Sequence, residues 1–180
     1  MRRAVFLDRD GVLNEPLVRA GKPYPPTTLA QFRLYPEAAR VCRSLRDAGF
    51  VLIVVTNQPD VARGTQRKEV VESFHQVLRS ELAVDDVFCC FHDDGDQCEC
   101  RKPRPGLLLA GAERWQVDLT QSFLVGDRWR DVEAGRTAGT ATVFIDRGYA
   151  ESLRGPPTAT VFSLEEAAAF ILQGEGGVRA

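Results

Sequence analysis

Lysine is scarce in this chain of 180 residues and occurs at three positions, Lys22, Lys68 and Lys102. Lysine and arginine together number 23 against 25 aspartates and glutamates, so the formal net charge is −2. Proteins that bind nucleic acid or anionic membranes carry an excess of basic residues, which this chain lacks. We therefore expect neither a nucleic acid nor a membrane among its partners.

Long apolar runs are also missing, because none reaches the roughly 20 residues that a transmembrane helix needs. Two arginines follow Met1, as in a signal peptide, but Asp8 interrupts the apolar stretch too early for one. We expect a cytoplasmic protein with a single domain at 1–173 and a frayed tail at 174–180. A hydrophobic content of 44% is enough for one ordinary core.

Short β-rich stretches alternate with amphipathic ones, which predicts an α/β fold with a mostly parallel sheet. Residues 50–55 are apolar at every position, as is typical of a strand buried on both faces of such a sheet. The proline-rich segment 14–32 predicts a loop, which is either a plain surface connection or a substrate-facing one. We predict strands at 4–7, 50–55, 87–91, 122–125, 142–145 and 160–162, and helices at 36–48, 68–81, 106–115, 131–138 and 164–172.

Aspartates follow two of the predicted strands. Asp8 and Asp10 are spaced i, i+2, which places both carboxylates on one side of an extended backbone, and Asp127 and Asp131 are spaced i, i+4. Parallel strands bring their carboxyl ends to one edge, where ligands bind, and carboxylate oxygens suit Mg²⁺. The alternatives are an ordinary turn at Asp10-Gly11 and a helix-dipole role for Asp131.

A hydroxyl and a lysine extend this acidic group. The hydroxyl and backbone N–H of Thr56 can bind phosphate oxygens at a strand end, and Lys102 can offset the charge of a transferring phosphoryl group. Taken alone, Lys102 has a simpler explanation as a solvated surface charge. The position of Lys102 directly after a cysteine-rich segment favours a functional role for it.

Three of the five cysteines lie with a histidine in one short segment of spacing C-x-H-x5-C-x-C. Three thiolates and an imidazole match a closed tetrahedral zinc site, and in a reducing compartment metal is favoured over disulfides. The alternative is a chance group of buried thiols. A zinc ion here would fix the loop that carries Arg101 and Lys102. The predicted ligands are Cys90, His92, Cys98 and Cys100.

Four motifs of this chain resemble the signature set of the haloacid dehalogenase (HAD) phosphatase superfamily. They are FLDRDG at 6–11, TNQ at 56–58, RKP at 101–103, and GDR at 126–128 followed by Asp131. The zinc spacing is similar to that of the histidinol-phosphatase-like branch. The resemblance implies a three-layer Rossmann-like fold without a substantial cap domain, in which a zinc-bound loop shapes the pocket.

The same resemblance implies roles for the four aspartates. Asp8 is expected to attack phosphorus and form an aspartyl-phosphate, while Asp10 protonates the leaving oxygen and then activates water. Mg²⁺ is expected on Asp8, the backbone carbonyl of Asp10 and Asp127, with Asp131 supporting these ligands from behind.

The resemblance also implies that the remaining motif residues bind phosphate and substrate. Thr56 and Lys102 are expected on the transferring phosphoryl group with Asn57 beside them, and Arg101 and Arg128 on the substrate or its second phosphate. Residues 56–64 and 101–106 resemble enzymes that cleave the 7-phosphate of D-glycero-D-manno-heptose 1,7-bisphosphate. We therefore expect a monomeric, Mg²⁺-dependent phosphatase that hydrolyses a phosphate monoester of a phosphorylated sugar. Histidinol phosphate is an alternative substrate, and a non-catalytic phosphosugar-binding module is an alternative of another class.

Overall fold

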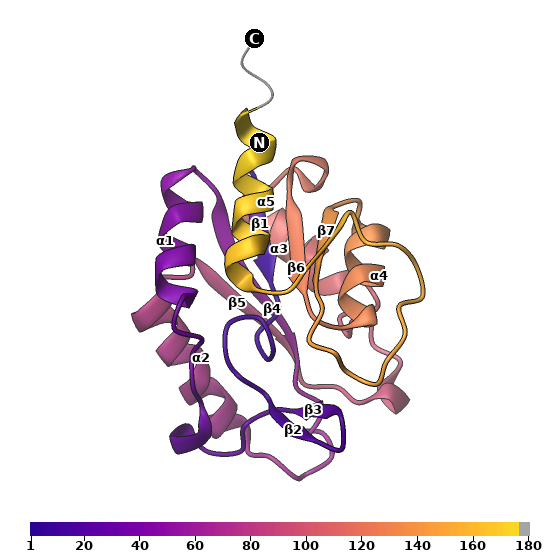
Figure 1. Ribbon diagram of the computed structural model, residues 1–180. Coiled ribbons are helices and arrows are strands. Elements are labelled where there is room, and N and C mark those ends of the chain that lie inside the picture. The colour runs from indigo at the N-terminus through magenta and orange to yellow at the C-terminus, as the bar shows by residue number, and fades with distance from the viewer. Residues whose placement is uncertain (177–180) are drawn as a thin grey trace.

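The computed structural model describes residues 1–176, with residues 175 and 176 described by their backbone alone. Its centre is a six-stranded sheet of order β5-β4-β1-β6-β7-β8, in which every neighbouring pair is parallel (Figure 1). The predicted α/β fold with a mostly parallel sheet is confirmed. The strands are β1 (Ala4–Leu7), β4 (Val51–Asn57), β5 (Asp86–Cys90), β6 (Phe123–Gly126), β7 (Ala141–Ile145) and β8 (Ala159–Val161).

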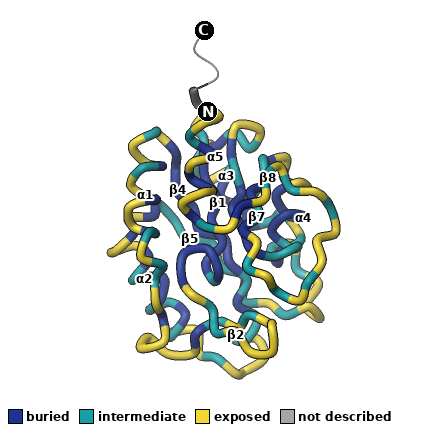
Figure 2. The backbone as a smooth tube through the Cα atoms, in the orientation of Figure 1, coloured by how far each residue is buried: buried dark blue, intermediate teal, exposed yellow. Residues whose placement is uncertain are grey.

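Helices cover both faces of this sheet and make the predicted three layers. Val5 and Leu7 of β1 pack in one apolar cluster with α1, α2 and α5, and Ala4 and Phe6 pack in a second cluster with α3 and α4. This alternation follows from the two-residue period of a strand, and β1 is buried on both faces (Figure 2). The helices are α1 (Ala38–Asp47), α2 (Lys68–Leu82), α3 (Gly106–Trp115), α4 (Trp129–Ala138) and α5 (Leu164–Gly176), with short 3-10 helices at Leu29–Gln31, Asp94–Asp96 and Leu119–Gln121.

The strand order determines where a ligand can bind. From β1 the chain builds outward through β4 and β5, and it then returns to the other side of β1 with β6. In such sheets the crevice lies beyond the carboxyl ends of the strands where this order reverses, here β1 and β6. Asp8 directly follows β1 and Asp127 directly follows β6, so the topology brings the two predicted acidic pairs to the same crevice.

The 14–32 segment contains a small hairpin that the sequence did not predict. Strands β2 (Leu17–Arg19) and β3 (Lys22–Tyr24) pair antiparallel across a turn at Ala20 and Gly21, which both have positive φ angles. Strands of three residues are too short for a recognisable alternation. The hairpin lies beside the carboxyl edge of the sheet (Figure 1), and no separate cap domain is present within residues 1–176.

Several predicted element boundaries are wrong by a few residues. Strand β4 extends beyond 55 because Thr56 and Asn57 pair with the last two residues of β5. Helix α4 begins at Trp129 rather than at 131, and α5 continues to Gly176. Residues 174–176 of the expected tail are therefore helical, and 177–180 lie outside the described residues.

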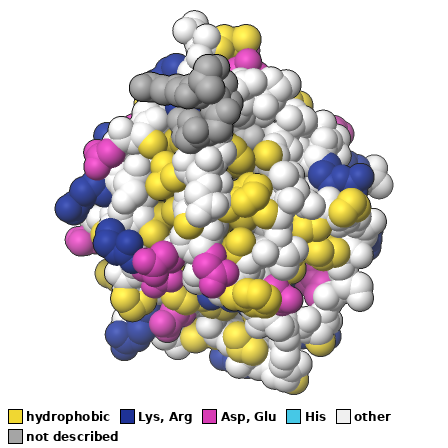
Figure 3. Space-filling model, turned by 45° about the horizontal axis from the view of Figure 1, so that its top comes forward, with side chains coloured by type: hydrophobic (Ala, Val, Ile, Leu, Met, Phe, Trp, Pro, Cys, Tyr) yellow, Lys and Arg dark blue, Asp and Glu magenta, His cyan; other side chains and the backbone are white. Residues whose placement is uncertain are grey.

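Two features of the described residues are the charges on their surface and the length of their helices. On the face in Figure 3, basic and acidic side chains are interspersed, and no continuous basic tract covers it. Among the described residues, no helix is both long and apolar enough to cross a bilayer.

Candidate active site

A cavity of about 280 Å³ opens at the carboxyl edge of the sheet. Pro23 and Tyr24 of the hairpin form part of its wall, so the 14–32 segment faces the site. Every residue that the sequence predicted for phosphate, magnesium or substrate binding lines this one cavity. These residues are Asp8, Asp10, Thr56, Asn57, Arg101, Lys102, Asp127, Arg128 and Asp131.

Three buried carboxylates meet in this cavity. Asp8, Asp127 and Asp131 each place one oxygen within 4.8 Å of the others, and Asp127 Oδ1 is buried without a hydrogen-bond partner. Burial raises the pKa of Asp8 to about 6, and burial together with the charge of Asp8 raises the pKa of Asp127 well above its usual value. An unpartnered buried oxygen beside two carboxylates fits a hard divalent cation such as Mg²⁺.

Glycines make room for two of these carboxylates. A Cβ at Gly11, where φ is +85°, would lie 1.8 Å from Asp127 Oδ2, and a Cβ at Gly126 would lie 2.2 Å from the Cβ of Asp131. Real side chains cannot approach so closely, so both positions require glycine. Gly11 of the Asp-Gly turn considered from the sequence therefore also leaves the space that the Asp127 carboxylate occupies.

Lys102 is buried in the middle of the acidic group. Its Nζ donates to Asp131 Oδ1 at 2.6 Å and to the Val55 carbonyl at 2.7 Å, and it lies 2.9 Å from Asp8 Oδ1. Burial alone would lower the pKa of Lys102, but the charges of Asp131 and Asp8 raise it above its usual value. The solvated surface charge considered as the simpler explanation is therefore wrong.

Asn57 and Asp131 hold the elements around this lysine. The Asn57 amide donates to the Lys102 carbonyl at 2.9 Å and its oxygen accepts from the Lys102 N–H at 3.1 Å, so Asn57 fixes the backbone of Lys102. Asp131 Oδ2 accepts from the Arg128 N–H at 3.0 Å at the start of α4. Asp131 thus combines a helix-capping contact with the ion pair to Lys102.

The cysteine-rich segment forms a compact cluster that fits zinc. The sulfur atoms of Cys90, Cys98 and Cys100 lie 3.2–3.7 Å apart, and His92 Nδ1 lies 3.3 Å and 3.6 Å from two of them. Zinc–sulfur bonds of about 2.3 Å in a tetrahedron require sulfur separations of about 3.8 Å, close to these values. The four residues therefore match a closed metal site, and all three thiols are free of disulfides.

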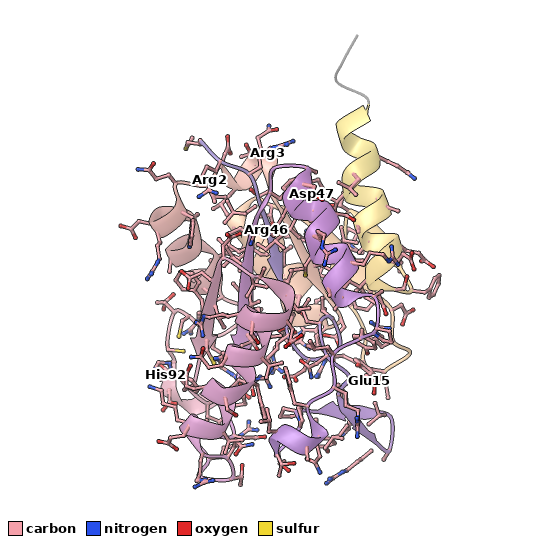
Figure 4. The ribbon with its side chains drawn as sticks, turned by 90° about the vertical axis from the view of Figure 1, so that its left-hand side faces the viewer. Arg2, Arg3, Glu15, Arg46, Asp47 and His92 are labelled. Atoms are coloured by element: carbon pink, nitrogen blue, oxygen red, sulfur yellow. The ribbon has the colours of Figure 1, made fainter. Side chains whose placement is uncertain are left out.

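The same segment holds Arg101 in the cavity. Arg101 Nε donates to Asp94 Oδ1 at 2.7 Å, and its Nη1 donates to the His92 carbonyl at 3.4 Å. Figure 4 shows His92 at the same end of the molecule as Glu15, near the carboxyl edge, and far from Arg2 and Asp47. A metal ion on this cluster would fix both partners of Arg101.

The family model for haloacid dehalogenase-like hydrolases matches residues 26–139. The chain belongs to this family. The match includes Thr56, Lys102 and Asp127 and begins after Asp8 and Asp10, so the placement of those two in the same cavity is independent of it.

Similar proteins with assigned activities cover most of the chain. A D-glycero-beta-D-manno-heptose-1,7-bisphosphate 7-phosphatase of Rhodopseudomonas palustris is 40% identical over 150 residues, which are 77% of this chain and 80% of that protein. The enzyme of that name from Escherichia coli is 33% identical over 156 residues, 80% of this chain and 78% of its own. The structure of D,D-heptose 1.7-bisphosphate phosphatase from B. bronchiseptica, complexed with magnesium and phosphate, has a TM-score of 0.83 and 28% identity and covers 96% of this chain and 99% of its own.

The sequence motifs of this hydrolase did not predict the residues that hold Asp10. Arg9 is fully buried, and its Nη2 donates to Asp10 Oδ2 at 2.8 Å. The amides of Asn14 and Gln58 donate to the two Asp10 oxygens at 2.9 Å and 2.8 Å. The side chain of Asp10 is still 18% exposed toward the cavity that it lines. The sequence contains one indication of the contact between Arg9 and Asp10, because Arg9 lies between two aspartates at the end of an apolar strand.

Arg9 is itself held by two aromatic rings. Its guanidinium carbon lies 5.3 Å from the ring centroid of Phe74 and 5.8 Å from that of Phe32, and the two rings stack on each other. A guanidinium between rings and a carboxylate is fixed in both position and direction. Arg9 is therefore a positioning residue for Asp10.

We expect Arg9→Lys to lower kcat by about 10- to 100-fold with little change in KM, because lysine cannot reproduce a forked contact worth about 1.5–3 kcal/mol. Steady-state kinetics on a sugar bisphosphate and thermal melting measure the two effects separately. Arg40→Gln, which breaks the exposed pair with Glu165, is the matched control and should leave kcat unchanged. Equal kcat values for Arg9→Lys and the wild type would contradict the positioning role.

Proposed function

We propose that this chain is a Mg²⁺-dependent phosphatase that hydrolyses the 7-phosphate of D-glycero-D-manno-heptose 1,7-bisphosphate through an aspartyl-phosphate. The observation that carries the proposal is the buried group of Asp8, Asp127 and Asp131 around Lys102, in a cavity that Asp10 also lines. This arrangement supplies a nucleophile, a cation site and a proton-transfer group at one place. The names of the similar phosphatases support the sugar substrate.

The reaction has two steps at the same phosphorus atom. A carboxylate oxygen of Asp8 bonds to phosphorus while the bond from phosphorus to the sugar oxygen breaks, and Asp10 gives its proton to that oxygen. Asp10 then accepts a proton from a water molecule whose oxygen attacks the same phosphorus. The bond to Asp8 breaks, inorganic phosphate leaves, and Asp8 and protonated Asp10 are restored.

Other cavity residues bind and orient the phosphoryl group. Mg²⁺ on Asp8, Asp127 and the backbone carbonyl of Asp10 would supply positive charge that offsets the charge of the phosphoryl oxygens. Lys102 adds a further positive charge, and Thr56 adds a hydroxyl that is nearly buried in the cavity wall.

The remaining predicted residues face the rest of the sugar. Arg101 and Arg128 would contact the substrate or its second phosphate, and Asn57 would act through Lys102. We also propose that the cluster of Cys90, His92, Cys98 and Cys100 binds zinc, which would keep Arg101 in place. We further propose that the protein is a monomer of the cytoplasm, where its free thiols would stay reduced.

A side-by-side turnover comparison with Mg²⁺ tests this proposal. Phosphate release is measured from the α and β anomers of heptose 1,7-bisphosphate, from fructose 1,6-bisphosphate and from histidinol phosphate. We expect kcat/KM for a heptose bisphosphate to exceed that for histidinol phosphate by at least about 100-fold, as for a site that binds two phosphates instead of one. Faster phosphate release from histidinol phosphate would show that histidinol phosphate, and not the heptose bisphosphate, is the substrate. No phosphate release from any of these compounds would support a non-catalytic binding module.

A further inference from the structure

Four arginines surround the cavity, and three of them are neutralised by nearby carboxylates. Arg63 pairs with Asp93 at 2.6 Å and with Asp60 at 3.3 Å. Arg101 pairs with Asp94 at 2.7 Å, and Arg128 pairs with Glu151 at 2.5 Å. The fourth, Arg130, is different.

Arg130 has a much weaker set of partners. Its nearest carboxylate oxygen is Asp94 Oδ1, 3.9 Å from its Nη2, and this oxygen already accepts from Arg101. The Nε of Arg130 is buried without a hydrogen-bond partner, and no hydrogen bond from its guanidinium is present among the described residues. Burial and the charges of Arg101 and Arg128 lower the pKa of Arg130. A cation that shares its carboxylate partner with another arginine and lies next to like charges is stabilised when a further anion joins it.

The guanidinium of Arg130 is nevertheless fixed in place. It lies 5.0 Å from the ring centroid of Trp129, and Arg154 lies over the same ring at 3.5 Å. The indole thus holds two arginines by cation–π contacts. Such a preorganised, planar donor suits the bidentate recognition of a phosphate.

Arg130 also lies between two hollows. It lines the active-site cavity together with Asp8, and it lines a second hollow that has five cationic side chains and two carboxylates. Arg101 and Lys102 line both hollows as well. The positive charge therefore increases from the reacting centre toward this second hollow, away from the carboxylate group.

We propose that Arg130, supported by Trp129 and Arg154, is a specificity-determining residue that binds the non-reacting phosphate of the substrate. This inference rests on the proposed function and deepens it, because it requires a substrate with a second anionic group. The reacting phosphate then lies at Asp8 and Lys102, and the sugar lies between the two positions. A phosphosugar without the second phosphate lacks this contact to Arg130 and binds less well.

The test compares heptose 1,7-bisphosphate with heptose 7-phosphate, which keeps the reacting phosphate and lacks the distal one. We expect Arg130→Gln to reduce the preference for the bisphosphate, measured as the ratio of the two kcat/KM values, by about 10- to 100-fold. Arg136→Gln changes the same charge on the same helix, outside both hollows, and should keep the wild-type preference. An unchanged preference in Arg130→Gln, or an equal loss in both variants, overturns the proposal.

Two further measurements separate the possible explanations. In an Asp8→Asn background, calorimetric titration with heptose 1,7-bisphosphate should show about 10- to 100-fold weaker binding when Arg130→Gln is added, without any turnover. Inhibition by inorganic phosphate should change less than this. If phosphate inhibition weakens as much, Arg130 binds the reacting phosphoryl group and the distal assignment is wrong. If the wild type prefers heptose 7-phosphate or cleaves neither sugar, the proposed function fails and this inference fails with it.

Discussion

Asp8→Asn is expected to reduce turnover by about 10⁴-fold or more while the protein remains folded, as for the loss of a catalytic nucleophile. The asparagine has the shape of aspartate but cannot form an acyl-phosphate at neutral pH. Lys102 keeps its pairing with Asp131 and its bond to the Val55 carbonyl, so no buried cation is left without a partner. The loss should therefore arise from chemistry and not from unfolding.

Stability provides the second part of this experiment. The pKa of Asp8 is raised to about 6 because burial and the charge of Asp131 disfavour its ionised form, against the favourable charge of Lys102. Removing this charge from the metal-free protein should leave the melting temperature equal or higher. The control is Asp47→Asn, an exposed change at the end of α1 opposite the site (Figure 4). Asp47→Asn should keep wild-type turnover, and undiminished activity in folded Asp8→Asn would refute the covalent mechanism.

The part of the site that local patterns determine was predictable from the sequence. Residues 50–55 indicated a doubly buried strand, and a parallel sheet brings the ends of its strands to one edge. This is why Asp8, Thr56 and Asp127 could be assigned to one place without coordinates. The spacing around Cys98 and Cys100 likewise predicted a four-residue cluster, because the ligands of such a site lie close together in sequence.

Contacts between distant segments were not predictable in this way. The contact between Arg9 and Asp10 depends on the rings of Phe32 and Phe74, which come from two other parts of the chain. The weak pairing of Arg130 arises because the packing of the chain places Asp94 closer to Arg101 than to Arg130. In both cases the sequence shows the charge but not its partner.

Removal of the zinc ion proposed for the cysteine cluster is expected to lower the stability of the protein and its activity together. A ligand at 1,000 times its Kd stabilises the folded state by about 4 kcal/mol, so loss of the ion should lower the melting temperature by roughly 8–16 °C in a chain of this size. Activity should fall as well, because the loop carries both the Asp94 carboxylate and the His92 carbonyl that hold Arg101. Chelation with metal analysis, melting and kinetics measures all three quantities.

Cys100→Ser and Cys42→Ala separate the role of the ion from that of a thiol. Cys100 belongs to the cluster, so its replacement should remove bound zinc and reproduce the effects of chelation, and added zinc should not reverse them. Cys42 is a buried residue of α1 in the apolar cluster that does not contain Cys90, and Cys42→Ala should keep one zinc per chain and wild-type kcat/KM. A zinc-free protein with an unchanged melting temperature and full activity would show that the cluster does not need a metal. A lower melting temperature with full activity would mean that Arg101 keeps its position without the ion. The ion would then contribute to stability but not to catalysis.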